Sequence, residues 1–129
     1  MNNIDILNIR RKLEQLKDRV IENDRLNNDY RRTFEELLDK LSVSYDSLHI
    51  EPRFIREKTS QDRYIELRIT TNGIYFASNF THLSSIDNYL PIMEKMLDRS
   101  IEEYEKQNKT LTDNLEKLKK KLNILKTVT

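Results

Sequence analysis

The chain has 129 residues and a formal net charge of +1, and 35% of its residues are charged. This length suits one domain, and one glycine and two prolines are typical of long solvated helices rather than of a turn-rich fold. The absence of cysteine excludes disulfides, thiol catalysis and cysteine-based metal sites. The N-terminus has no apolar run like a signal peptide, and no stretch approaches a membrane span, so a cytoplasmic protein that does not contact a membrane is expected.

Residues 4–41 are predicted to form one long helix, because apolar residues recur at alternating steps of three and four. The recurring positions are Ile6, Ile9, Leu13, Leu16, Val20, Asn23, Asn27, Tyr30, Phe34, Leu37 and Leu41. A run of this length without a break indicates a coiled-coil seam, in which Tyr30 and Phe34 are core residues.

Residues 43–83 change to a period of two, which predicts a three-stranded β-meander. The first strand is placed around Leu48 and Ile50, and it is either an edge strand or interrupted near Pro52, because proline cannot donate to a ladder. The polar segment 58–62 is read as a turn into the strand "RYIELRIT". In that strand Ile65, Leu67 and Ile69 share one apolar face.

The only glycine follows Asn72, between two alternating runs. Asn-Gly at such a place predicts a type I′ hairpin turn, which needs positive φ at both central residues. This turn predicts a register that puts all the large apolar residues of the hairpin on one face. The expected pairs are 71 with 74, Ile69 with Phe76, Leu67 with Ser78 and Ile65 with Phe80.

Residues 86–127 are predicted to form the second helix, with Ser84 and Ser85 as candidate capping residues and Pro91 fitting best in a first turn. In its seam two steps of four follow one another, and the second, from Leu97 to Ile101, breaks the alternation as a stutter does. The seam positions are Ile86, Leu90, Met93, Leu97, Ile101, Tyr104, Asn108, Leu111, Leu115, Leu118, Leu122 and Leu125.

The two seams can be aligned antiparallel so that both ends match and Asn23 faces Asn108. Asparagine is one of the few polar residues that fix register in a seam. The sequence therefore favours an α+β fold of one domain, 1–129: an antiparallel coiled-coil hairpin with the meander inserted between its helices. The alternative is a parallel homodimer, in which Asn27 and Asn108 each pair with their own copy.

The order of helix, small β region and helix resembles that of prefoldin subunits over most of the chain. The resemblance lies in the order of elements, and it implies an antiparallel helix pair and assembly through the β region. Independently, a three-stranded sheet with one apolar face needs a cover, so a homo-oligomer, most simply a dimer, is expected.

Tyrosines and arginines are expected to point outward from the meander, where they could bind a protein partner. The candidate partner-binding residues are Tyr64, Arg68, Tyr75, Arg53 and Arg56. The alternative is burial of these side chains beneath a helix or a second protomer.

Both ends of the chain are basic, and an antiparallel pair would bring them together at one end of the rod. Such a cluster could bind nucleic acid through its phosphates, or it could simply be a solvated surface. Its candidate residues are Arg10, Arg11, Lys17, Lys119, Lys120 and Lys121.

No phosphate-binding loop, nucleophile motif or metal-ligand spacing is present, and His49 and His82 stand alone. A protein without catalytic activity or cofactor is therefore expected. Its expected function is to bind another protein, as a scaffold, an adaptor or a holding factor. The alternatives are a nucleic-acid-associated factor and a small inhibitor of a larger host complex.

Overall fold

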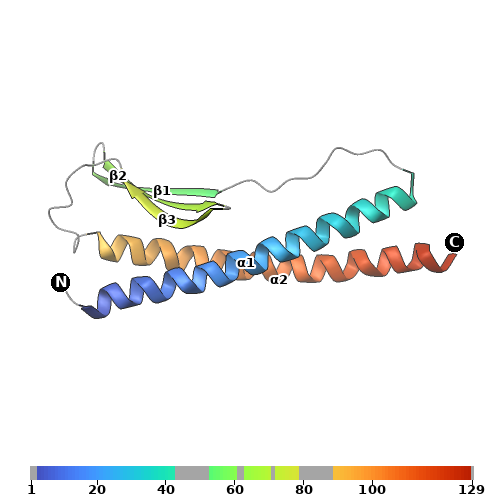
Figure 1. Cartoon of the computed structure of the whole chain (residues 1–129), viewed down its shortest axis with the longest axis horizontal. Coiled ribbons are helices and arrows are strands. Elements are labelled where there is room, and N and C mark those ends of the chain that lie inside the picture. Colours follow the sequence, from blue (N-terminus) through green and yellow to red (C-terminus); the bar gives the residue numbers. More distant parts are fainter. Residues whose placement is uncertain (1–2, 43–52, 61–62, 71, 79–88, 129) are drawn as a thin grey trace. The chain divides into compact units, whose positions relative to one another are not determined.

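The computed structural model describes residues 3–42, 53–60, 63–70, 72–78 and 89–128 (Figure 1). The elements in chain order are α1 (Asn3–Lys40), β1 (Arg53–Ser60), β2 (Arg63–Thr70), β3 (Gly73–Ser78) and α2 (Leu90–Val128). This order confirms the predicted α+β class, with a three-stranded sheet between two long helices in the sequence. The chain divides into two compact units. Unit 1 is Met1–Lys17 with Glu51–Glu102, and unit 2 is Asp18–Ile50 with Glu103–Thr129.

The end of α1 and the start of α2 follow from local chemistry. After Lys40, the amide of Ser42 donates to the carbonyl of Asp39 at 3.1 Å, and Ser42 has a φ of 58°, which is the left-handed conformation that commonly ends a helix. The second helix begins at Leu90, so Pro91 lies in its first turn, where the missing amide hydrogen costs no hydrogen bond. The serines proposed as caps lie outside the described residues.

The strands form one antiparallel sheet in the order β1-β2-β3, as a meander requires. The first strand begins at Arg53, directly after Pro52, and extends to Ser60 with a register irregularity between Lys58 and Ser60. Lys58–Ser60, predicted as part of a turn, are therefore strand residues. Leu48 and Ile50, around which this strand was predicted, lie outside the described residues.

The register between β2 and β3 differs from the prediction by two residues. Ile69 pairs with Ile74, and Leu67 pairs with Phe76, because Gly73 is already the first residue of β3 and pairs with Thr70. The predicted type I′ turn is wrong: among the described non-glycine residues only Ser42 has a positive φ. A shift of two residues leaves each side chain on its original face, so the predicted apolar face is retained.

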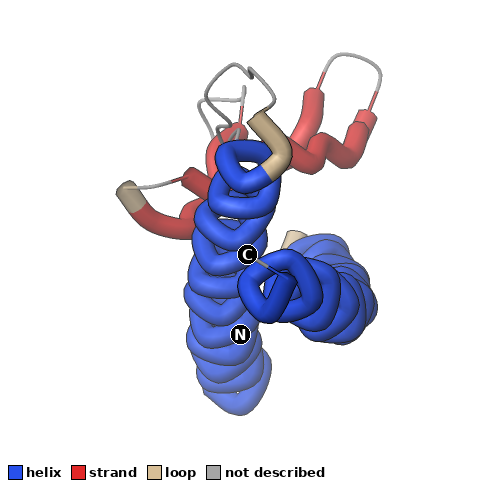
Figure 2. The backbone as a smooth tube through the Cα atoms, turned by 90° about the vertical axis from the view of Figure 1, so that its right-hand side faces the viewer, coloured by secondary structure: helices blue, strands red, loops and turns tan. Residues whose placement is uncertain are grey.

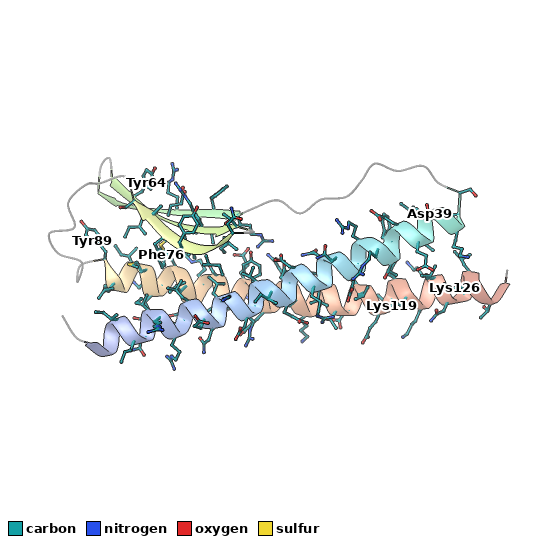
Figure 3. All side chains as sticks on the ribbon, viewed as in Figure 1. Asp39, Tyr64, Phe76, Tyr89, Lys119 and Lys126 are labelled. Carbon is teal, nitrogen blue, oxygen red and sulfur yellow. The ribbon has the colours of Figure 1, made fainter. Side chains whose placement is uncertain are left out.

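Unit 1 buries that apolar face against helix residues. In Figure 1 the strands lie along the unit 1 part of α2, Figure 2 draws the same strands in red, and Figure 3 shows Phe76 on the side of the sheet that faces α2. An ion pair of 3.1 Å between Arg99 and Glu57 joins α2 to β1. The buried residues of this unit's core are Ile9, Leu16, Ile65, Leu67, Ile69, Leu90, Met96, Leu97 and Ser100.

Unit 2 is a pair of helix segments whose contacts fix their direction. Arg19 binds Glu105 at 3.1 Å, Asn23 binds Asn108 at 2.9 Å, and Glu36 binds Lys126 at 2.9 Å. In these three contacts a higher residue number in α1 goes with a higher one in α2, so the two segments run parallel. Figure 1 shows that the α1 and α2 segments of unit 1 also run parallel to each other. The predicted antiparallel direction, which the resemblance to prefoldin subunits also implied, is therefore wrong.

Charges on either side of the seam explain the parallel direction. The antiparallel register would have set Arg10, Arg11 and Lys12 beside Lys119, Lys120 and Lys121, which is repulsive. In the structure Lys12 instead binds Glu94 at 2.6 Å and Asp98 at 2.9 Å. These hydrogen bonds raise the pKa of Lys12, and Glu94 makes the larger contribution.

The seam itself is largely as predicted. Tyr104 and both paired asparagines are buried, whereas Tyr30 and Phe34 are half-buried and stack with ring centroids 6.1 Å apart. The ends of the predicted α1 seam, Ile6 and Leu41, are exposed, and Leu26, which lies outside the predicted seam, is buried.

Candidate functional site

The candidate site is the face of the sheet opposite the apolar face, which we call the outer sheet face. Alternation along the strands and the strand register place side chains in rows across this face. Phe54, Arg68 and Tyr75 form one row, and Arg56, Glu66 and Ala77 form the next. Tyr64 follows on β2, and Figure 3 shows it on the side away from Phe76.

Glu66 is the centre of an ionic cluster on this face. Its Oε2 accepts hydrogen bonds from Nε and Nη2 of Arg56 at 3.0 and 2.8 Å, and its Oε1 accepts one from Nε of Arg68 at 2.5 Å. The two arginines cover the carboxylate, so that Glu66 is only 5% exposed. The hydrogen bonds from Arg68 and then from Arg56 lower the pKa of Glu66, and the same contact raises the pKa of Arg68.

Each of these arginines also lies against a tyrosine. The guanidinium carbon of Arg56 is 3.9 Å from the centroid of the Tyr64 ring, and that of Arg68 is 6.0 Å from the centroid of the Tyr75 ring. Both distances are within the range of cation–π attraction. A continuous series of side-chain contacts therefore runs from Tyr64 through Arg56, Glu66 and Arg68 to Tyr75.

The outer sheet face is suited to binding rather than to proton transfer. Both oxygens of Glu66 are already held by guanidinium groups, and its lowered pKa makes the carboxyl a poor proton donor near neutral pH. Phe54 and Tyr75 are 58% and 45% exposed. Across the described ranges no group of three or more His, Cys, Asp or Glu side chains could hold a metal ion.

Four of the five predicted partner-binding residues come together on this face: Arg56, Tyr64, Arg68 and Tyr75. Arg53 does not, because it pairs with Ile69 and alternation places it on the apolar side of β1. The prediction grouped the arginines by type, whereas Arg53 and Arg56 are three positions apart and so occupy opposite faces.

Sequence reasoning did not include Phe54 and Glu66 in the site. The signal for Glu66 was present, because it alternates with Tyr64 and Arg68 in the strand. The signal for Phe54 depended on placing β1 after Pro52, which the prediction did not do.

The predicted nucleic-acid residues are divided between the two units. All six are exposed, but Arg10, Arg11 and Lys17 belong to unit 1, whereas Lys119, Lys120 and Lys121 belong to unit 2. Their proposed proximity depended on antiparallel helices. His49 and His82 lie outside the described residues.

Neither described helix has a stretch apolar enough, over a sufficient length, to cross a membrane. Comparisons of the chain with protein-family models, with curated proteins and with solved structures found no match.

Proposed function

We propose that this protein is a non-enzymatic scaffold or adaptor that binds another protein through its outer sheet face. The observation that carries the proposal is the exposure of Phe54 and Tyr75 beside two arginines whose positions are fixed by a buried carboxylate. Aromatic residues and arginine are the residue types that most often dominate the binding energy of protein interfaces.

The restricted conformations of the arginine side chains on this face also support the proposal. Long arginine side chains normally lose conformational entropy when a partner binds, which weakens binding. Here Glu66, Tyr64 and Tyr75 already restrict Arg56 and Arg68 before any partner arrives. A partner would therefore meet a surface whose arginines need little further ordering.

Site-specific photo-crosslinking in cells that naturally make the chain tests the proposal. A photoreactive phenylalanine analogue replaces Phe54 in one variant, and in the control it replaces Ile124, which is 62% exposed on α2 in unit 2. We expect a defined protein adduct from position 54 that is absent from position 124. Adding Tyr75→Ala to the position-54 variant should weaken that adduct.

Adducts that are identical at both positions, or the absence of any adduct from position 54, would show that the outer sheet face is not the binding site. Circular dichroism of each variant checks that the sheet and helices remain folded. Phe54, Tyr75 and Ile124 are all exposed, so these substitutions remove little buried apolar surface.

A further inference from the structure

We infer that the partner docks an acidic segment on the outer sheet face, with a carboxylate bound by the guanidinium donors of Arg56 and Arg68 that Glu66 does not use. The inference rests on the proposed protein-binding function and adds the chemistry of the partner. The segment that binds this face is an acidic segment of another protein rather than a second copy of the chain.

Arg56 and Arg68 have more N–H donors than Glu66 accepts. A guanidinium carries five N–H donors. Glu66 accepts from Nε and Nη2 of Arg56 and from Nε of Arg68. Among the described residues Glu66 does not use all of these donors, and the side chains of Arg56 and Arg68 are 55% and 37% exposed. A carboxylate matches the geometry of such donors better than a neutral amide does.

The net charge of the outer sheet face also favours an acidic partner. The described side chains of the outer sheet face carry two positive charges, on Arg56 and Arg68, and one negative charge, on Glu66. The excess is positive, so the face attracts an acidic segment. Two copies that met through this same face would bring their arginines together, because a two-fold interface repeats the same patch on both sides. Repulsion disfavours that arrangement.

The aromatic residues define what should lie next to the carboxylate. Phe54 pairs across the strands with Arg68, which in turn pairs with Tyr75, so apolar surface flanks this guanidinium on both sides. A partner segment with a carboxylate beside an apolar or aromatic side chain would cover both kinds of surface. Burial of the ion pair beneath that apolar side chain would strengthen it.

Selection from a random twelve-residue peptide library displayed on phage tests the inference without assuming a sequence. The full chain is the bait. Counter-selection uses the triple variant Arg56→Gln, Glu66→Gln, Arg68→Gln, which removes the cluster without leaving an unpaired charge on the face. Arg25→Gln with Arg32→Gln, two exposed arginines of α1, is the matched control. We expect the selected peptides to be rich in Asp and Glu next to apolar residues.

Synthetic peptides then give the quantitative test by fluorescence anisotropy. Replacing the acidic residues of a selected peptide by their amides should weaken its binding about tenfold or more. The triple variant should weaken binding of the acidic peptide by a similar factor, and the control variant should not.

Several results would overturn the inference. Selection of neutral or basic peptides, equal affinity for the amide peptide, or tighter binding of a twelve-nucleotide single strand would each do so. If the crosslink from position 54 persists in any of these cases, the proposed function stands and only the acidic chemistry is wrong. If that crosslink joins two copies of the chain, a homo-oligomer forms there instead. If no peptide is selected and no crosslink forms, both proposals fail.

Discussion

Gly73 and Thr70 show how single residues close the β2–β3 connection. Gly73 has a φ of 144°, a conformation that residues with a side chain rarely adopt. Thr70 pairs with it, and the Thr70 hydroxyl donates to the carbonyl of Gly73 at 3.1 Å while accepting from the amide of Asn72 at 3.2 Å. The hydroxyl of Thr70 therefore helps to close this connection, a role that the Asn-Gly pattern did not reveal.

Substitution of Gly73 tests whether backbone strain or space requires glycine here. Apart from Gly73 itself and its two chain neighbours, no heavy atom lies within 4 Å of where a Cβ would be, so backbone strain rather than lack of space opposes a Cβ here. Gly73→Val should reduce the free energy of unfolding by about 1–3 kcal/mol. D-alanine, introduced by chemical ligation, favours positive φ and should be tolerated. Denaturant unfolding measures both, and equal losses for the two variants would contradict the strain explanation.

Glu66 should make the sheet sensitive to acid. Because its pKa in the folded chain lies below the ordinary value of 4.5, its contribution to stability is present above that pH and is lost as pH falls through the lowered pKa. We expect the free energy of unfolding to fall more between about pH 6 and about pH 3 in the wild type than in Glu66→Gln. Glu116→Gln, an exposed site on α2, is the control. Parallel pH profiles for wild type and Glu66→Gln would rule out this role.

At the scale of elements, the paired asparagines join the helix segments of unit 2 through a connected set of hydrogen bonds. Asn23 donates to Asn108 at 2.9 Å, Asn27 donates to Asn23 at 2.8 Å, and Asn108 donates to the carbonyl of Arg19 at 3.1 Å. Asn23 and Asn108 are both buried, so either one would be costly to leave without its partner. The pairing that was predicted for antiparallel helices occurs here between parallel ones.

A double-mutant cycle on Asn23→Leu and Asn108→Leu measures this contact. Each single change removes one hydrogen-bond partner of a buried amide, whereas the double change removes both amides. We expect the two effects on the free energy of unfolding to be non-additive by about 0.5–3 kcal/mol. In the control cycle, Asn114→Leu, which is exposed on α2, should be additive with Asn23→Leu. Additivity in the first cycle would mean that the asparagines do not interact.

At the scale of the whole molecule, the direction of the helix pair is the feature with the widest consequence. The prediction of one basic cluster depended on antiparallel helices, and its two sets of residues belong to different units.

Spin labels test the direction within unit 2. Labels at Glu36 and Lys126, which form an ion pair at 2.9 Å, should give a short distance. Labels at Glu36 and Glu105 should be farther apart, because the two α2 positions are separated by about 32 Å at 1.5 Å per residue. An antiparallel pair would reverse the order of the two distances. Pulsed electron paramagnetic resonance on the intact chain measures both label-to-label distances.

Much of the fold follows from periodicity. Steps of three and four predict α1 and α2, and alternation predicts β2 and β3, because each pattern puts apolar side chains on one side of its element. The candidate site was predictable in the same way on β2 and β3, where Tyr64, Arg68 and Tyr75 alternate with apolar residues. It was not predicted on β1, because that strand was placed around Leu48 and Ile50, whereas β1 begins at Arg53.

Periodicity and spacing alone predict the types of the elements, their order, the apolar face of the sheet and the pairing of Asn23 with Asn108. The helix direction, the register of β3 and the enclosure of Glu66 by Arg56 and Arg68 depend on contacts between elements. They do so because the sequence patterns are symmetric. A seam has the same spacing when it is reversed, and a strand shifted by two residues keeps its faces. Only contacts between elements, above all between opposite charges, distinguish such arrangements.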